Sequence, residues 1–351
     1  MVRYYTRACN FYYGERSKIL INNKKTLPLS GNKSISFDKI EIITRKSKKI
    51  VSLSAINKLP IKIKKIVKKD LKVIVKPKVF HKILSFKSTP KIMGVLNITP
   101  DSFSDGGKYL KDKLAIKQLN FLFLFKNGAD IVDIGGESTR PGSKAISSKL
   151  EWKRIKVVLK KIKKEKVVSL DTRKSDIMKK GIKLGVKLIN DISGLSFDKN
   201  TIHILKKYKT PFVLHHSLNT PDIMQKNPKY KNVVLDIYDF FEKKISFLRS
   251  NGINHKNIIL DPGIGFGKNL KHNMTIIKNI SIYHSLGFPI LLGMSRKRFI
   301  KEISKQNDSY SRIGGTISSN IFAMMQGVEL LRVHDVNEIN QSIKVFRELL
   351  K

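Results

Sequence analysis

The sequence predicts an α/β protein, and three observations support this prediction. From residue 91 onward, eight short apolar runs alternate with longer segments of helical periodicity, a pattern typical of a (β/α)₈ barrel. The apolar runs are rich in Val, Ile and Leu, as expected of strands that are covered on both faces. The segment 91–351 is also close in length to a typical TIM barrel, roughly 250 residues. We therefore expect a TIM barrel with a small mixed N-terminal appendage.

The predicted strands follow one another at regular intervals. In chain order they span residues 91–99, 129–136, 167–173, 187–194, 211–216, 258–263, 289–295 and 329–336. Amphipathic segments between them predict helices, among them 149–164, 233–250, 270–286, 312–327 and 337–350. Several helical segments end in a glycine just before the next strand, at Gly128, Gly185, Gly252, Gly287 and Gly327. Glycine readily takes the left-handed conformation that ends a helix, so these residues mark helix ends.

The first 90 residues have a different pattern and predict a separate unit. Residues 35–43 and 61–75 alternate apolar and polar side chains and predict short strands. We therefore divide the chain into an appendage at 1–80, a linker at 81–90 and the barrel at 91–351.

Composition limits the class of protein. A chain of 351 residues with 41% hydrophobic residues can bury a sizeable core. Cys9 is the only cysteine, which excludes an intrachain disulfide and a cysteine-based zinc site. The first nine residues lack the apolar region of a secretory signal, and the apolar run 121–125 is far shorter than the roughly 20 residues that span a bilayer. We expect a cytoplasmic protein without a membrane partner.

The formal charge of +43 raises the possibility of a nucleic-acid partner. Lysine is spread through nearly every segment, however, and does not form one basic patch with interleaved aromatic residues. This distribution favours a compositional bias, and we do not expect nucleic acid to be the partner. The positive field should still attract small anionic substrates.

Polar residues follow nearly every predicted strand. Side chains at the carboxyl ends of barrel strands converge on one face, where active sites of this fold lie. Any single Asp or Asn after a strand is also a common helix cap or turn residue, but here almost every strand has one. The residues are Asn97, Glu137, Thr139, Arg140, Asp171, Asn190, Asp191, His216, Asp261, Ser295, Lys297, Arg332 and His334.

Three of these residues suit a flat heterocycle that carries both donors and acceptors. Asp171 and Asp261 accept hydrogen bonds from ring N–H groups, while Asn190 both donates and accepts. Buried carboxylates need a ligand or a cation as partner, and Lys297 is a candidate counter-charge. The alternative interpretation is that these residues are structural groups in a polar barrel mouth.

Two further features predict a phosphate and metal site. Arg332 and His334 lie on the same face of a strand by the period-two rule and form a cationic pair for phosphate oxygens. Asn97 is a candidate ligand for Mg²⁺, which often takes few protein ligands together with waters and substrate phosphates. Either feature alone could be structural.

The glycine-rich segment 261–268, DPGIGFGK, does not fit the nucleotide-binding templates. A P-loop needs Gly where Pro262 stands and Ser or Thr where Asn269 stands. We expect its glycines to permit close backbone approach under a ligand, with Phe266 offering its ring face.

Five segments together resemble dihydropteroate synthase, and the resemblance covers nearly all of residues 91–340. The first is IMGVLNITPDSFSDGG at 92–107 and the second is DIGGESTRPG at 133–142. The others are residues 261–268, 293–297 and 332–336, and all five occur in the family's order.

The resemblance implies the residues of each subsite. The implied pterin pocket comprises Asp171, Asn190, Asp261, Lys297 and Arg332. The implied pyrophosphate site comprises Asn97, Arg332 and His334, with Mg²⁺ bound at Asn97. The implied p-aminobenzoate site comprises Thr139, Arg140, Pro141, Phe266, Ser295 and Lys297, and a closing loop adds Phe103 and Asp105. Catalysis would then depend on Asp171, Asp261, Lys297 and Asp105.

The same resemblance implies the reaction and partners. The enzyme would condense 6-hydroxymethyl-7,8-dihydropterin pyrophosphate with p-aminobenzoate, be inhibited by sulfonamides and form a homodimer. One departure is Asn219, where relatives often carry glycine, which affects only local loop geometry. The alternatives are a pterin-binding methyltransferase, a basic nucleic-acid-binding protein, and a degenerate barrel kept for ligand or partner binding.

Overall fold

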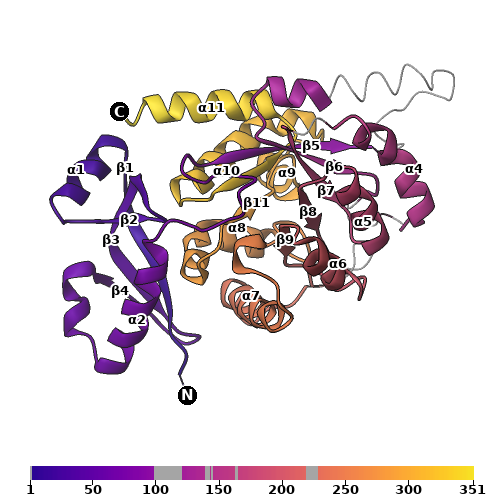
Figure 1. Ribbon diagram of the computed structural model, residues 1–351. Helices are drawn as coiled ribbons and strands as arrows, with labels where there is room; N and C mark the ends of the chain where they lie inside the picture. Colours follow the sequence, from indigo (N-terminus) through magenta and orange to yellow (C-terminus); the bar gives the residue numbers. More distant parts are fainter. Residues whose placement is uncertain (1, 99–120, 139–142, 144, 163–164, 219–227) are drawn as a thin grey trace.

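The computed structural model describes residues 2–98, 121–138, 143, 145–162, 165–218 and 228–351 (Figure 1). Eight parallel strands form one sheet in the order β10-β9-β8-β7-β6-β5-β12-β11. Leu260 in β10 also bridges Ile290, just before β11. The two edges of the sheet therefore meet, and the predicted TIM barrel is confirmed.

Every observed barrel strand lies within its predicted range. The strands are β5 Lys91–Asn97, β6 Ile131–Gly135, β7 Val167–Asp171, β8 Leu188–Asp191, β9 Phe212–His215, β10 Ile258–Asp261, β11 Leu291–Leu292 and β12 Leu330–Val333. The observed strands are mostly shorter than the predicted ranges, and several of them end in a polar residue, namely Asn97, Asp171, Asp191 and Asp261. Those polar residues therefore lie at the mouth of the barrel.

Helices surround the barrel strands (Figure 1). Those with described bounds are α4 Ser148–Leu159, α5 Ser175–Lys183, α6 Thr201–Tyr208, α7 Val233–Ser250, α8 Leu270–Lys278, α9 Arg298–Ser304, α10 Ile313–Met325 and α11 Val336–Glu348. The predicted glycine ends are confirmed by positive φ angles, for example 87° at Gly287. Within the described residues, no helix has both the length and the apolar character needed to cross a membrane.

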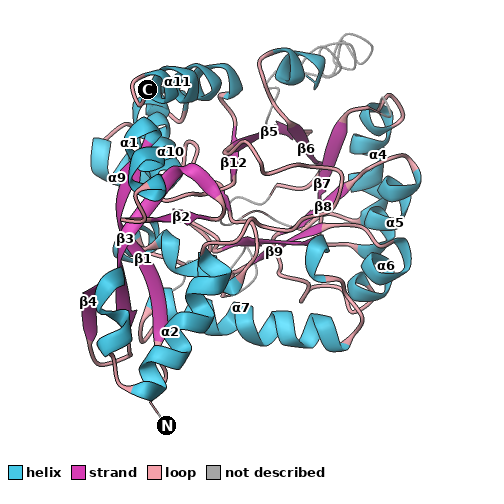
Figure 2. Cartoon of the chain, turned by 60° about the vertical axis from the view of Figure 1, so that its left-hand side comes forward, coloured by secondary structure: helices cyan, strands magenta, loops and turns pink. Residues whose placement is uncertain are grey.

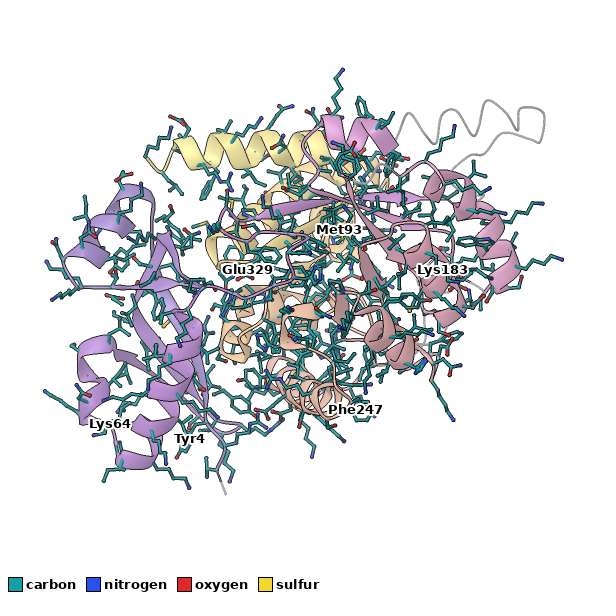
Figure 3. All side chains as sticks on the ribbon, viewed as in Figure 1. Tyr4, Lys64, Met93, Lys183, Phe247 and Glu329 are labelled. Carbon is teal, nitrogen blue, oxygen red and sulfur yellow. The ribbon has the colours of Figure 1, made fainter. Side chains whose placement is uncertain are left out.

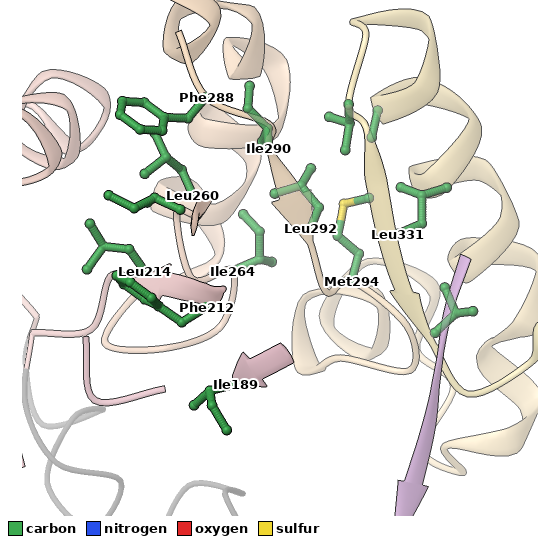
Figure 4. Packing of buried hydrophobic residues seen from close by; sticks show 14 of the residues in the cluster. Ile189, Phe212, Leu214, Leu260, Ile264, Phe288, Ile290, Leu292, Met294 and Leu331 are labelled. Atoms are coloured by element: carbon green, nitrogen blue, oxygen red, sulfur yellow. The ribbon is translucent and has the colours of Figure 1, made fainter. Parts of the chain in front are cut away.

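The barrel buries apolar residues in two places. The larger cluster packs between the strands and the outer helices and includes Phe212, Leu260 and Leu292 (Figure 4). A second cluster lies at the amino-terminal ends of the strands and comprises Met93, Ile131, Leu188, Val213, Ile259, Leu291 and Leu330. Phe80 and Phe86 pack against it, so the segment before β5 covers this end of the barrel.

The N-terminal part is a four-stranded antiparallel sheet with two α-helices. Its elements are β1 Tyr5–Tyr13, α1 Gly14–Asn22, β2 Leu27–Leu29, β3 Asn32–Ile43, β4 Lys48–Ser52, the 3₁₀-helix η1 Leu53–Lys58 and α2 Ile61–Ile74. The strand predicted at 35–43 is confirmed, but the strand predicted at 61–75 is wrong. Val67, Leu71 and Ile74 are buried on one face of α2, and this spacing of three to four residues is the period of a helix.

The N-terminal sheet packs directly against the barrel (Figure 2). Strand β1 lies along the 3₁₀-helix η4 Ile280–Leu286, where the Ser281 hydroxyl donates to the Ala8 carbonyl at 3.0 Å. The Tyr5 ring meets Tyr238 edge-on at 5.2 Å, and its hydroxyl donates to Asp239 at 2.8 Å. The appendage therefore forms a buried interface with the barrel.

Replacing Tyr5 by alanine should destabilise the whole chain by about 3 kcal/mol, because the ring is fully buried between the two parts. Tyr5→Phe is the matched control and should cost only about 1 kcal/mol, since it removes one hydrogen bond and keeps the ring. Urea unfolding followed by circular dichroism measures both. An alanine variant as stable as the wild type would show that the interface does not stabilise the barrel.

Lysine side chains occur on both parts of the chain. Lys64 in the appendage and Lys183 at the end of α5 lie on opposite sides of the molecule (Figure 3). Lysines on both sides of the molecule are compatible with the compositional bias inferred from the sequence.

Candidate active site

Four side chains from four strands meet at the mouth of the barrel. The Arg332 guanidinium in β12 donates to Asp133 in β6 at 2.7 Å and to Asp171 in β7 at 2.9 Å. The Asn190 amide in β8 donates to the same Asp133 oxygen at 2.9 Å. The structure thus brings together Asp171, Asn190 and Arg332, three of the residues predicted from the sequence.

Asp133 joins this group although the sequence analysis did not single it out as a site residue. Its carboxylate is fully buried. Its Oδ1 and the Oδ1 of Asn190 have no hydrogen-bond partner among the described residues. The sequence signal that could have identified Asp133 is a single carboxylate within the apolar strand β6, since a buried charge needs partners. Two buried acceptor atoms are therefore left without a donor.

Burial controls the charges of this cluster. It raises the pKa of Asp171 to about 8, against the opposing effect of the Arg332 charge. Burial also raises the pKa of Asp191 to about 6, although the backbone N–H and the hydroxyl of Ser193 donate to its carboxylate. A ligand that brings N–H donors would relieve this cost of burial.

Asp261 and Lys297 lie on the other side of the barrel mouth. The Asp261 carboxylate accepts from the Gly263 N–H at 2.7 Å, and its other oxygen is 4.0 Å from the His215 ring. The Lys297 ammonium donates to the Ile264 carbonyl. Burial raises the pKa of Asp261 and lowers that of Lys297 to about 8, so burial works against the charged form of both groups.

The glycine-rich turn after β10 holds an aromatic ring at the site. Gly263 has φ of 71°, and a Cβ there would lie 2.0 Å from the His216 carbonyl oxygen, so only glycine fits. The predicted close approach is real, but the neighbour is the backbone at the end of β9. The Phe266 ring meets the His215 ring edge-on at 4.5 Å and lies 4.6 Å from the Lys297 ammonium.

Lys268 is a second residue that the sequence analysis did not assign to the site. Its buried ammonium lies 3.1 Å from His216 Nδ1 and donates to the Phe266 carbonyl at 2.8 Å. Burial lowers the pKa of Lys268 well below its usual range. The lysine fastens the glycine-rich turn to the residue that follows β9.

Ser295 lies beside His334. Its hydroxyl is 3.2 Å from the His334 backbone nitrogen and 3.1 Å from His334 Nδ1. The two residues of the predicted cationic pair therefore have different partners. Arg332 is bound to carboxylates, while His334 contacts Ser295.

Asn97 lies at the exposed end of β5, next to the carboxylate cluster. A Cβ built on Gly135 would lie 3.6 Å both from the Asn97 amide oxygen and from Asp171 Oδ2. Among the described residues, no three His, Cys, Asp or Glu side chains are grouped to hold a metal. One amide oxygen beside an open mouth fits Mg²⁺, which often keeps its waters and substrate phosphates as ligands.

Glu137 makes contacts that support the local structure. It is paired with Arg173 at 2.9 Å and Lys174 at 3.1 Å, and it accepts from the Ile146 N–H at 2.9 Å. These contacts hold the end of the loop after β6. The predicted residues Phe103, Asp105, Thr139, Arg140 and Pro141, and also Asn219, lie outside the described residues.

Comparison with known proteins gives consistent matches. Residues 93–334 match the family described as pterin binding enzyme. The dihydropteroate synthase of Escherichia coli strain K12 is 37% identical over 265 residues, which are 75% of this chain and 93% of the relative.

Solved structures match over a similar share of the chain. A Clostridium difficile dihydropteroate synthase, solved in the presence of pteroic acid, has a TM-score of 0.70 and 37% identity, and the match covers 76% of this chain and 98% of that one. The Xanthomonas albilineans enzyme with 4-aminobenzoic acid has a TM-score of 0.70 and 32% identity, covering 76% of this chain and 94% of that one. The chain belongs to the dihydropteroate synthase family of pterin-binding enzymes, which are transferases of folate biosynthesis.

Proposed function

We propose that this barrel mouth joins 6-hydroxymethyl-7,8-dihydropterin pyrophosphate to p-aminobenzoate, giving 7,8-dihydropteroate and pyrophosphate. The observation that carries the proposal is the pair of buried acceptors, Asp133 Oδ1 and Asn190 Oδ1, which lack partners among the described residues. A pterin edge is rich in N–H donors and would satisfy them. The relatives that hold pteroic acid and 4-aminobenzoic acid support the same substrates here.

The pterin ring is proposed to lie between the two sides of the barrel mouth. Asp171, Asn190 and Asp261 would bind its N–H groups, and Lys297 would donate to its carbonyl oxygen. Arg332 would flank the ring. The buried carboxylates with raised pKa values support this placement, because they gain most from new donors.

Carboxylates at this position suit the proposed chemistry. Departure of pyrophosphate breaks a C–O bond and leaves a pterin-methyl cation, which Asp171 and Asp261 stabilise electrostatically. The p-aminobenzoate amine then attacks that carbon and loses a proton. Residues that exclude water at this stage prevent hydrolysis of the cation.

The pyrophosphate is proposed to lie towards the strand ends that carry Asn97, Arg332 and His334. Arg332 and His334 would donate to phosphate oxygens. Bound Mg²⁺ would neutralise charge on the leaving pyrophosphate, and the Asn97 amide oxygen would hold it. The placement of Asn97 and Asp171 on the two sides of Gly135, where a built Cβ would lie 3.6 Å from an oxygen of each, supports this arrangement.

The p-aminobenzoate is proposed to pack on the Phe266 ring, near Ser295 and Lys297. The 4.6 Å approach of the Lys297 ammonium to the ring supports a place for its carboxylate there. Thr139, Arg140 and Pro141 are proposed to complete this subsite. Phe103 and Asp105 are proposed to close over it.

The test is pyrophosphate release by the purified full-length chain. We expect release only when the pterin pyrophosphate and p-aminobenzoate are both present, with inhibition by a sulfonamide that p-aminobenzoate relieves. Release from the pterin substrate alone, or methyl transfer from a methylated pterin in its place, would contradict the proposal.

Removing Mg²⁺ with a chelator should abolish this activity, and added Mg²⁺ should restore it. Asn97→Ala should raise the Mg²⁺ concentration for half-maximal activity roughly tenfold, because one ligand is lost. Full activity of the chelated wild type would argue against a metal. An Asn97→Ala variant with an unchanged Mg²⁺ requirement would place the ion elsewhere.

We also propose a homodimer formed through α10 and α11. The groove between these helices is lined by Ile317, Ile321, Val345, Phe346 and Leu349 together with polar residues. The side chains of Val345 and Leu349 are 61% and 79% exposed, and exposed apolar faces of this kind often mark subunit contacts.

Val345→Lys should convert the dimer to a monomer, since it places a charge in the apolar groove. Light scattering after size exclusion measures this. Val79→Lys is the matched control, because Val79 is 63% exposed and lies in the segment before β5, not in the groove. A monomeric wild type, or a dimeric Val345→Lys variant, would contradict this interface.

A cytoplasmic location is proposed as well. Cys9 is a buried free thiol, which suits a reducing compartment. Fractionation of cells that express the native chain would test it, and recovery of the chain outside the cytoplasmic fraction would contradict it.

A further inference from the structure

Arg296 has an unusual backbone conformation at the edge of the site. It stands between Ser295 and Lys297 and has φ of 60°, in the left-handed region that long side chains rarely adopt. Other residues with this conformation, such as Lys209 and Lys305, are at the C-terminal ends of helices, where it is common. Arg296 instead lies between β11 and α9, where no helix end requires it.

Three separate contacts hold Arg296 in this conformation. Its backbone N–H donates to the Thr316 hydroxyl of α10 at 3.1 Å, and its carbonyl accepts from Arg312 at 2.7 Å. Its guanidinium makes a two-point ion pair with Asp335, in which Nε donates at 3.0 Å. Backbone and side chain are therefore both fixed, which is how a strained residue persists.

The left-handed residue sends its two neighbours in different directions. The Ser295 hydroxyl faces His334, and the Lys297 ammonium reaches across to the Ile264 carbonyl in the turn after Asp261. The Arg296 side chain reaches the Tyr310 ring at 4.2 Å and Asp335 next to α11, whose Oδ2 also accepts from the Ser295 hydroxyl at 3.4 Å. One backbone angle thus sets the positions of groups on both the proposed phosphate and pterin sides.

Glycine would adopt this backbone angle without strain. It would lack the ion pair, and the loop would then be free to leave this conformation. An arginine in this strained conformation binds Asp335 and holds the loop in a single geometry. Pre-organised catalytic groups need such a fixed geometry.

We propose that Arg296, held by Asp335, Thr316 and Arg312, is a positioning residue for Lys297 and for the Ser295–His334 pair. It acts through its neighbours and does not touch substrate. The inference rests on the proposed function, because Lys297 and His334 are the groups that it positions for that reaction.

The test compares Arg296→Gly with Lys305→Gly. Both variants put glycine at a φ of 60°, but only the first removes an ion pair at the site. We expect Arg296→Gly to lower kcat about 10- to 100-fold, the scale of a small misplacement of reacting groups. Its thermal midpoint should match that of Lys305→Gly, whose kcat should equal that of the wild type. Asp335→Asn should reproduce the loss, and the double variant should lose no more than either single one.

A second readout reports directly on Lys297. The rate at which acetic anhydride labels Lys297 is measured against pH by mass spectrometry. Burial holds the wild-type pKa of this lysine near 8, so release of its side chain towards water should move the labelling curve to higher pH in Arg296→Gly. Unchanged kcat and an unchanged curve in Arg296→Gly would overturn the proposal. The labelling arm needs no turnover, so it decides the inference even if the wild type releases no pyrophosphate and the proposed function fails.

Discussion

Replacing Asp171 by asparagine should lower kcat about 10²- to 10³-fold, the scale of losing one pre-organised charge at a reacting centre. The carboxylate lies within 2.9 Å of the Arg332 guanidinium and beside Asp133. In our proposal the N–H donors of the bound pterin favour the ionised form of this carboxyl group, whose negative charge then stabilises the pterin-methyl cation. Asparagine keeps the shape without that charge. Binding of the pterin substrate should weaken less than turnover.

The same substitution should not destabilise the fold at neutral pH. Burial raises the pKa of Asp171 to about 8 in the folded state, above its value of about 4 in an unfolded chain. The folded state therefore binds the proton more tightly, and the carboxyl group contributes stability that is lost as pH rises from about 4 to 8. Asparagine removes this dependence, so the thermal midpoint of the variant should fall less than that of the wild type across this range.

Steady-state kinetics and thermal melts between pH 5 and 8.5 check both statements. Asp176→Asn is the control, because Asp176 is an exposed carboxylate on α5 that pairs with Lys180 at 3.2 Å. It should leave kcat and the pH dependence of the melt unchanged. Near-normal kcat in Asp171→Asn would remove this carboxylate from the mechanism.

The barrel was predictable because its signals are local and repeated. Each strand is a short apolar run, and residues such as Gly128 and Gly287 mark the helix ends before them. The carboxyl ends of parallel strands meet in any closed barrel, so chain order alone was enough to predict that Asp171, Asn190 and Arg332 converge. These predictions needed no knowledge of side-chain direction.

The remaining features depend on contacts between distant segments. Asp133 became part of the site because β6 lies two strands from both β8 and β12, which places Asn190 and Arg332 within reach. The prediction of a strand at 61–75 came from the alternation of Ile and Lys at the start of this segment. Val67, Leu71 and Ile74 on the buried face of α2 pack in one cluster with Ala8, Phe37 and Ile40 of the N-terminal sheet. The helix α2 also contacts η4, more than 200 residues later, and a local pattern shows neither partner.

Asp133 has a consequence for specificity, because it fixes the direction of the Asn190 amide. The Asn190 NH₂ group donates to Asp133 Oδ2 at 2.9 Å, so its carbonyl oxygen is left as an acceptor, and the same Asp133 oxygen accepts from Arg332 at 2.7 Å. In Asp133→Asn the new amide oxygen can take the place that accepts from Arg332 and Asn190, which puts the new NH₂ group where the wild type has the unpartnered Oδ1. The ligand would then meet a donor where the wild type presents an acceptor.

Asp133→Asn should therefore raise KM for the pterin substrate about 10- to 100-fold, since a mismatched buried hydrogen bond costs about 1–3 kcal/mol. KM for p-aminobenzoate should stay within about twofold, because its proposed subsite lies on the Phe266 side. A wild-type KM for the pterin substrate in Asp133→Asn would show that Asp133 Oδ1 does not accept from the pterin.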